Sequence, residues 1–81
     1  QNYPNPFNPT TTIGYVINEK SNIKLTLYNA LGKEIAVLVN AEQEKGYHKT
    51  VVNADNLASG VYFYKLQAGS LVQTRKMMLL R

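Results

Sequence analysis

Apolar and polar residues alternate along the segment Ile23-Lys24-Leu25-Thr26-Leu27-Tyr28. Successive side chains of a β-strand point to opposite faces, so this alternation predicts a strand whose three aliphatic side chains face a core. Lys24 and Thr26 are then expected to face outward. The next four residues, 29–32, are Asn, Ala, Leu and Gly, which favour a turn. The segment therefore indicates a β-protein rather than a helical one.

The same pattern recurs on both sides of this segment at the spacing of a sandwich or small barrel. Strands are predicted at Thr11–Ile17, Ile23–Tyr28, Glu34–Asn40, Tyr47–Asn53, Val61–Gln67 and Leu71–Leu80. A short extended piece at Tyr3–Phe7 is a candidate seventh strand. We expect an all-β, antiparallel sandwich of six to seven strands. Residues 1–81 would form one domain, with a proline-rich leader at 1–10 and the sandwich at 11–81.

Two segments depart from simple alternation. Residues 34–45 contain tolerable helix formers, but the β-branched run 35–39 and the flanking glycines, Gly32 and Gly46, favour a strand followed by a turn. In Leu71–Leu80, both alternating sets of residues mix apolar and polar side chains. That mixture predicts either a bulge near Lys76 or burial on both faces toward the end of the strand.

The connections carry their own predictions. Gly69 is the residue able to adopt positive φ in a tight hairpin between the last two strands. In the link 54–60, Leu57 and Gly60 precede Tyr62 at a spacing that resembles the tyrosine corner of immunoglobulin-like sandwiches. In that motif a tyrosine hydroxyl bonds back to the upstream connection. The link is therefore predicted to cross between two sheets.

Catalytic and metal chemistry find little support in the composition. The chain has no cysteine, so it offers neither disulfides nor thiolate ligands. His48 is the only histidine and Asp55 the only aspartate, and a triad would require both to meet one of three serines, Ser21, Ser59 or Ser70. Glu42 and Glu44, beside Lys45, have the pattern of a solvated loop. We expect no catalytic, cofactor-binding or metal residues, no cofactor, no small-molecule substrate and no enzymatic activity.

The net charge of +4 lies entirely in the C-terminal third. Residues 1–55 hold five lysines and five acids, whereas residues 56–81 hold Lys65, Arg75, Lys76 and Arg81 without an acid. A basic end suits an acidic partner or an anionic lipid headgroup, although it is also typical of a solvated strand face.

Cations and aromatic residues are interleaved only at Tyr62–Lys65, so we expect no nucleic-acid partner. Six tyrosines leave a sugar-binding module as an alternative.

All three prolines lie within the leader, at positions 4, 6 and 9. Proline fixes φ near about −65° and removes a backbone donor, so the leader is a stiff, non-helical segment. Such a segment can simply protect a sheet edge from pairing with other chains. The chain starts without Met and inside this motif, which favours the tail of a longer protein. No run approaches the roughly 20 apolar residues that span a bilayer.

Four segments, taken in order, resemble the C-terminal sorting domain of the type IX secretion system. They are the leader Tyr3-Pro4-Asn5-Pro6-Phe7-Asn8-Pro9-Thr10 with the strand after it, residues 23–35, Gly46-Tyr47-His48 with residues 57–66, and Thr74-Arg75-Lys76-Met77. The resemblance covers essentially all 81 residues. It implies an immunoglobulin-like sandwich that acts as a non-enzymatic export signal for an attached N-terminal cargo.

The resemblance also implies partners and site residues. The partners would be an outer-membrane translocon, a β-barrel shuttle and a sortase-like protease that removes the domain. The cargo would pass through the periplasm to the cell surface or the medium. The recognition residues carried over are Tyr3, Pro4, Asn5, Pro6, Phe7, Lys76, Met77, Leu79 and Arg81, and the fold-defining residues are Gly32, Gly60 and Tyr62. A strand edge at the C-terminal end would be extended by a partner's backbone.

One alternative has a similar sequence basis. The Tyr-Pro-Asn-Pro-Phe opening and the Gly-x-Tyr turn at Gly60 also resemble the immunoglobulin-like accessory domain of flagellar hook-capping proteins. Such a domain would act by packing within an assembly, and its precursor would continue beyond it. A sorting domain, in contrast, would end its precursor.

Overall fold

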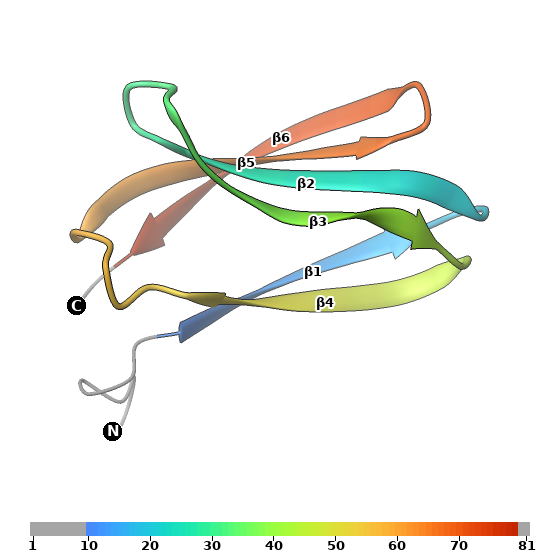
Figure 1. Cartoon of the computed structure of the whole chain (residues 1–81), viewed down its shortest axis with the longest axis horizontal. Helices are drawn as coiled ribbons and strands as arrows, with labels where there is room; N and C mark the ends of the chain where they lie inside the picture. The colour runs from blue at the N-terminus through green and yellow to red at the C-terminus, as the bar shows by residue number, and fades with distance from the viewer. Residues whose placement is uncertain (1–9, 80–81) are drawn as a thin grey trace.

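The computed structural model describes residues 10–79, which form six strands and no helix. The strands are β1 (Thr10–Ile17), β2 (Ser21–Asn29), β3 (Glu34–Gln43), β4 (Gly46–Asn53), β5 (Gly60–Ala68) and β6 (Leu71–Leu79). β1 and β4 form one sheet, and the other four strands form a second sheet in the order β3-β2-β5-β6. All paired strands are antiparallel, and the two sheets face each other as layers (Figure 1). The predicted all-β sandwich is confirmed, and the candidate strand Tyr3–Phe7 lies outside the described residues.

The core lies between the two sheets and consists mainly of alternate residues of β1, β2 and β5, with one buried residue each from β4, β6 and the β4–β5 link. Ile23 and Leu25 are fully buried and Leu27 is 1% exposed, as the alternation in β2 predicts. The remaining buried apolar residues are Ile13, Tyr15, Ile17, Val52, Ala54, Tyr62, Leu66 and Leu79. The two-residue period therefore predicts the inward face of β1, β2 and β5.

β3 is a strand, so the helical alternative at 34–45 is not adopted. The strand extends to Gln43, three residues beyond the predicted end, and residues 41–43 belong to it rather than to a turn. Its pairing with β2 shifts register twice, and the skipped residues are Ile35 and Leu38. Each shift is a β-bulge, which leaves one residue unpaired and increases the local twist.

Thr26 departs from its predicted exposure. It lies on the side of β2 opposite Leu25, as expected, yet it is only 1% exposed. β2 is a central strand, and Thr26 has Val37 on β3 and Lys65 on β5 as its two cross-strand neighbours. Because strands flank it on both sides, little of its surface remains accessible to solvent. Its hydroxyl has no hydrogen-bond partner among the described residues.

The two alternatives predicted for the last strand are both wrong within the described residues. The register of β5 with β6 runs without a shift from the Gly60–Leu79 pair to the Ala68–Leu71 pair, so no bulge occurs near Lys76. Burial on both faces is also absent, because Met78 is 63% exposed. The mixed sequence has another cause. β6 is an edge strand, and its inner face extends beyond the two-stranded sheet that lies opposite.

The connections follow the turn predictions. Gly69 has φ of 61° and forms a two-residue turn with Ser70, which confirms its predicted role in the hairpin. Only the first of these two residues has positive φ, which matches a type II′ turn. Residues 54–59 join β4 in one sheet to β5 in the other, so this link does cross between sheets.

Candidate recognition site

The free edge of β6 is one of the open edges of the four-stranded sheet. Ala68 and Leu71 flank the two-residue turn and therefore form a hydrogen-bonded pair, after which bonded and non-bonded pairs alternate along the hairpin. Thr74 and Lys76 fall in non-bonded pairs. Their backbone N–H and C=O groups consequently point away from β5, toward the open edge. This edge is able to accept another strand.

The predicted C-terminal recognition residues do not share one surface. Lys76 is exposed on the outer face, but Leu79 is 6% exposed in the core and Met77 is half-buried against it. Met77 and Leu79 therefore pack within the sandwich in this structure. The other recognition residues, Tyr3, Pro4, Asn5, Pro6, Phe7 and Arg81, lie outside the described residues.

Lys76 belongs to an outer surface that combines cations with apolar side chains. Lys76 lies opposite Phe63, which in turn lies opposite Tyr28. The Nζ of Lys65 is 5.5 Å from the centroid of the Tyr28 ring, within the range of a cation–π interaction. Met78 extends the same face along β6 and lies opposite Val61. We call this set of residues, 28, 61, 63, 65, 76 and 78, the outer β5–β6 surface.

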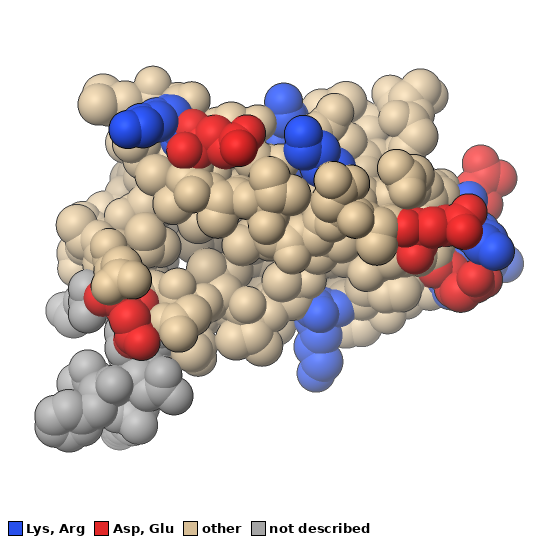
Figure 2. All heavy atoms as spheres, in the orientation of Figure 1, with Lys and Arg blue, Asp and Glu red and all other residues tan. Residues whose placement is uncertain are grey.

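The charges on the described surface are unevenly distributed. Lys20 Nζ contacts Glu42 Oε1 at 3.8 Å and Glu44 Oε2 at 3.5 Å, which links the β1–β2 connection to the end of β3 and to the β3–β4 connection. Figure 2 shows acidic and basic side chains together at that end of the molecule. Within residues 10–79, neither Lys65 nor Lys76 forms an ion pair. The outer β5–β6 surface therefore keeps a net positive charge, which attracts anionic partners.

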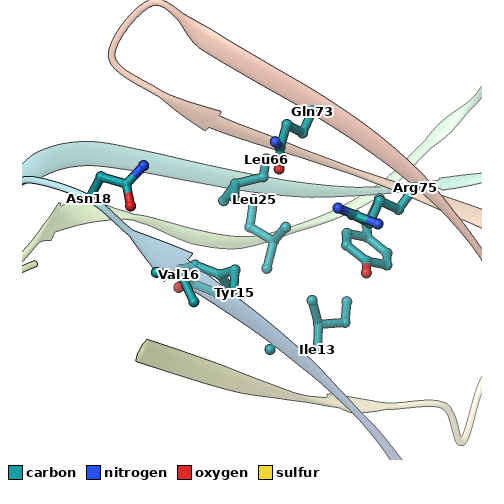
Figure 3. A pocket seen from close by; sticks show the side chains of 10 residues that line it. Ile13, Tyr15, Val16, Asn18, Leu25, Leu66, Gln73 and Arg75 are labelled. Carbon is teal, nitrogen blue, oxygen red and sulfur yellow. The ribbon is translucent and has the colours of Figure 1, made fainter. Parts of the chain in front are cut away.

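A second surface, on the inner face of β6, is not among the sites predicted from the sequence. Gln73 and Arg75 lie opposite Leu66 and Tyr64, which places them on the side of β6 that faces the other sheet. Both are exposed, and both line a cleft of about 450 Å³ between β6 and β1 (Figure 3). The signal was present in the sequence. Gln73 and Arg75 belong to the same alternating set as Met77 and Leu79. Polar residues in an otherwise inward-facing set indicate a part of the sheet that no described strand covers.

The residues considered for catalysis are engaged elsewhere or lie apart. The His48 ring stacks on Tyr15 with centroids 5.7 Å apart, and its Nε2 lies 2.7 Å from the carbonyl oxygen of Glu44. Asp55 is exposed beyond the end of β4, and the five strand steps from His48 to Asn53 span about 17 Å. In the described part of the chain, no three His, Cys, Asp or Glu side chains converge on a metal-sized site.

Residues 10–79 also contain no helix long and apolar enough to cross a membrane.

The described tyrosines form no row. Tyr15 and Tyr62 are buried at 8% and 7% exposure, whereas Tyr47 is 65% exposed on the outer face of the two-stranded sheet. Tyr28 and Tyr64 are half-buried and lie on opposite faces of the four-stranded sheet. A planar sugar-stacking platform needs adjacent exposed rings. These positions do not provide one.

Within residues 10–79, the sandwich has open sheet edges and a cationic surface without ion pairs, and both features suit recognition by protein partners. Comparison with protein families identifies the particular class. Residues 1–80 match the model of the secretion system C-terminal sorting domain, and the chain belongs to this family of type IX sorting domains. No curated protein and no solved structure matches the chain. Membership implies export to the cell surface or medium and interaction with the secretion machinery.

Proposed function

We propose that this domain is a folded, non-enzymatic signal that the type IX machinery recognises at β6. The match to sorting domains over residues 1–80 is the observation that carries the proposal. The structure adds a physical basis for recognition, because β6 offers an open edge next to the outer β5–β6 surface. A partner strand can extend such an edge by main-chain hydrogen bonds, while alternate side chains supply selectivity.

In this proposal the domain is attached to an N-terminal cargo that it takes across the outer membrane. The cargo passes from the periplasm to an outer-membrane translocon, and a β-barrel shuttle then carries it to a sortase-like protease that removes the domain. Lys76 contributes charge at the β6 edge. Met77 and Leu79 contribute by holding β6 against the core. Tyr3, Pro4, Asn5, Pro6, Phe7 and Arg81 complete the proposed recognition elements.

The test fuses residues 1–81 behind a Sec-exported fluorescent reporter in a bacterium with a working type IX system. Thr74→Pro removes a backbone donor at the open edge, while the pairing of residue 74 with β5 needs no hydrogen bond from that N–H. Thr74→Ala is the matched control, because it changes the side chain and keeps the donor. Lys76→Ala tests the charge separately.

The unchanged fusion and Thr74→Ala should reach the surface or medium with the domain removed. Thr74→Pro and Lys76→Ala should remain in the periplasm as intact fusions, and circular dichroism of each purified domain should show the same β-sheet spectrum. Export of Thr74→Pro at the unchanged level would exclude strand extension at β6. Retention of the unchanged fusion with its domain folded would exclude the sorting function.

A further inference from the structure

The two sheets of the sandwich are unequal, and within residues 10–79 one margin of the larger sheet has no strand opposite it. Two strands face four, and β1 pairs with β4 along one edge only. The free edge of β1 borders the cleft that Gln73 and Arg75 line from β6 (Figure 3). Alternate residues of β1 direct both backbone groups toward this edge. Within the described part of the chain, the cleft therefore has a wall of main-chain donors and acceptors that no neighbouring strand pairs.

The floor of the cleft is apolar, and one of its residues is partly exposed to solvent. Leu25 and Leu66 are buried beneath it, and the half-buried Tyr64 lies beside them. The cleft continues past Asn18 into an adjoining hollow of about 360 Å³ between Glu19 and the Gly69–Leu71 end of the β5–β6 hairpin. A strand added to β1 would lie about 4.8 Å from it and about 10 Å from the opposite sheet. Such a strand would run the length of this groove.

The charge in the cleft is unbalanced. Arg75 forms no ion pair within residues 10–79, and no carboxylate lines the cleft of about 450 Å³ around it. The amides of Asn18 and Gln73 line the same cleft and have no hydrogen-bond partner in the described part of the chain. Glu19 lies only at the far end, in the adjoining hollow. A bound peptide would complement these charges if it placed a carboxylate near Arg75 and no carboxylate near Glu19.

We propose that the β1–β6 cleft binds one extended peptide segment of a partner protein by strand addition to β1. A carboxylate of the segment pairs with the guanidinium of Arg75, and an apolar side chain two residues away covers Tyr64 and Leu66. The period of two in a strand places both side chains on the inward face. This site is on the opposite side of β6 from the outer β5–β6 surface, so the inference is independent of the proposed recognition at Lys76.

The test displays a library of random seven-residue peptides to the full 81-residue chain and, in parallel, to its Arg75→Gln variant. Lys76→Gln is the matched control, because it removes the same charge from the opposite face of the same strand. The unchanged chain and Lys76→Gln should enrich peptides with Asp or Glu two residues from a Val, Ile or Leu. Arg75→Gln should lose this preference. Arg75 and Lys76 are both exposed, so the fold is expected to persist in both variants.

The enriched peptide is then titrated into the ¹⁵N-labelled chain. Amide shifts should be confined to β1 and the inner faces of β5 and β6, and β1 amides should gain protection from hydrogen exchange. Arg75→Gln should weaken the binding about threefold to tenfold, and replacing the peptide's acid by its amide should cause no further loss in that variant. Shifts along the outer edge of β6 instead, or no enriched peptide, would overturn the proposal. Dimerisation through β1 without peptide would also overturn it, since a second copy would then fill the cleft.

Discussion

The hydroxyl of Tyr62 donates a hydrogen bond to the carbonyl oxygen of Ala58 at a distance of 2.8 Å. Tyr62 is the third residue of β5, and Ala58 lies four residues upstream in the link that crosses from β4. The ring is buried at 7% exposure, so the bond ties the crossing link to the core. A second bond, from the N–H of Leu57 to the carbonyl oxygen of Ala54 at 3.0 Å, shapes the same link. This is the geometry that a tyrosine corner requires.

Tyr62→Phe should lower the free energy of unfolding by about 1 kcal/mol, because it removes the hydroxyl while it keeps the buried ring. For a domain of this size that corresponds to a fall of roughly 4–8 °C in melting temperature. Tyr47→Phe is the control, since Tyr47 is 65% exposed and should change stability far less. Equal melting temperatures for Tyr62→Phe and the unchanged protein would show that the Tyr62 hydroxyl is not fold-defining.

Thr26→Val should stabilise the domain by about 1 kcal/mol. Thr26 is 1% exposed and its Oγ1 has no partner in the described residues, so an isosteric methyl group removes a buried, unsatisfied hydroxyl. Valine also suits a central strand. Thr26→Ser keeps the hydroxyl and deletes a methyl group, and we expect it to destabilise. Thermal unfolding of both variants checks the pair, and a lower melting temperature for Thr26→Val would show that the hydroxyl is satisfied in solution.

Gly32→Ala should cost about 1 kcal/mol through backbone strain alone. Gly32 has φ of 84° in the β2–β3 turn, a conformation that disfavours a Cβ, and apart from its two chain neighbours no described residue has an atom within 4 Å of the position where that Cβ would be. The turn itself is well bonded, since Oδ1 of Asn29 accepts the N–H groups of Leu31 and Lys33 at 2.9 and 3.0 Å. Gly32→Asn, a residue that tolerates this region, should cost less. If both substitutions cost the same in urea unfolding, strain is not the cause.

The sequence predicted most of the fold because two-residue alternation is a strong signal in β1, β2 and β5. Ile13, Tyr15 and Ile17 are all buried, as their spacing indicates. The alternation pattern did not predict burial where burial depends on the neighbouring strands or on the opposite sheet. Thr26 is covered only because β2 is central, and the polar side chains of Gln73 and Arg75 face inward only because the opposite sheet stops at β1. Strand order and sheet width are tertiary facts that a single strand does not encode.

Burial also divides the proposed recognition residues of β6 into two groups, buried and exposed. The last prediction compares one residue from each group. Leu79 is buried at 6% exposure, so Leu79→Ala should lower the free energy of unfolding by about 2–4 kcal/mol. Lys76 is exposed without an ion pair in the described part of the chain, so Lys76→Ala should change it by less than about 0.5 kcal/mol. Export of the reporter fusion should fall in both, for different reasons.

Measuring unfolding and export on the same two variants distinguishes stability from recognition. The Leu79→Ala fusion should be degraded in the periplasm, and Leu79→Met, which keeps most of the buried volume, should restore both stability and export. The Lys76→Ala fusion should accumulate intact, and Lys76→Arg should restore export because it keeps the charge. Loss of export with Leu79→Met at unchanged stability would instead mean that a partner contacts the side chain of Leu79 directly. In that case β6 would have to leave the core when the domain is recognised.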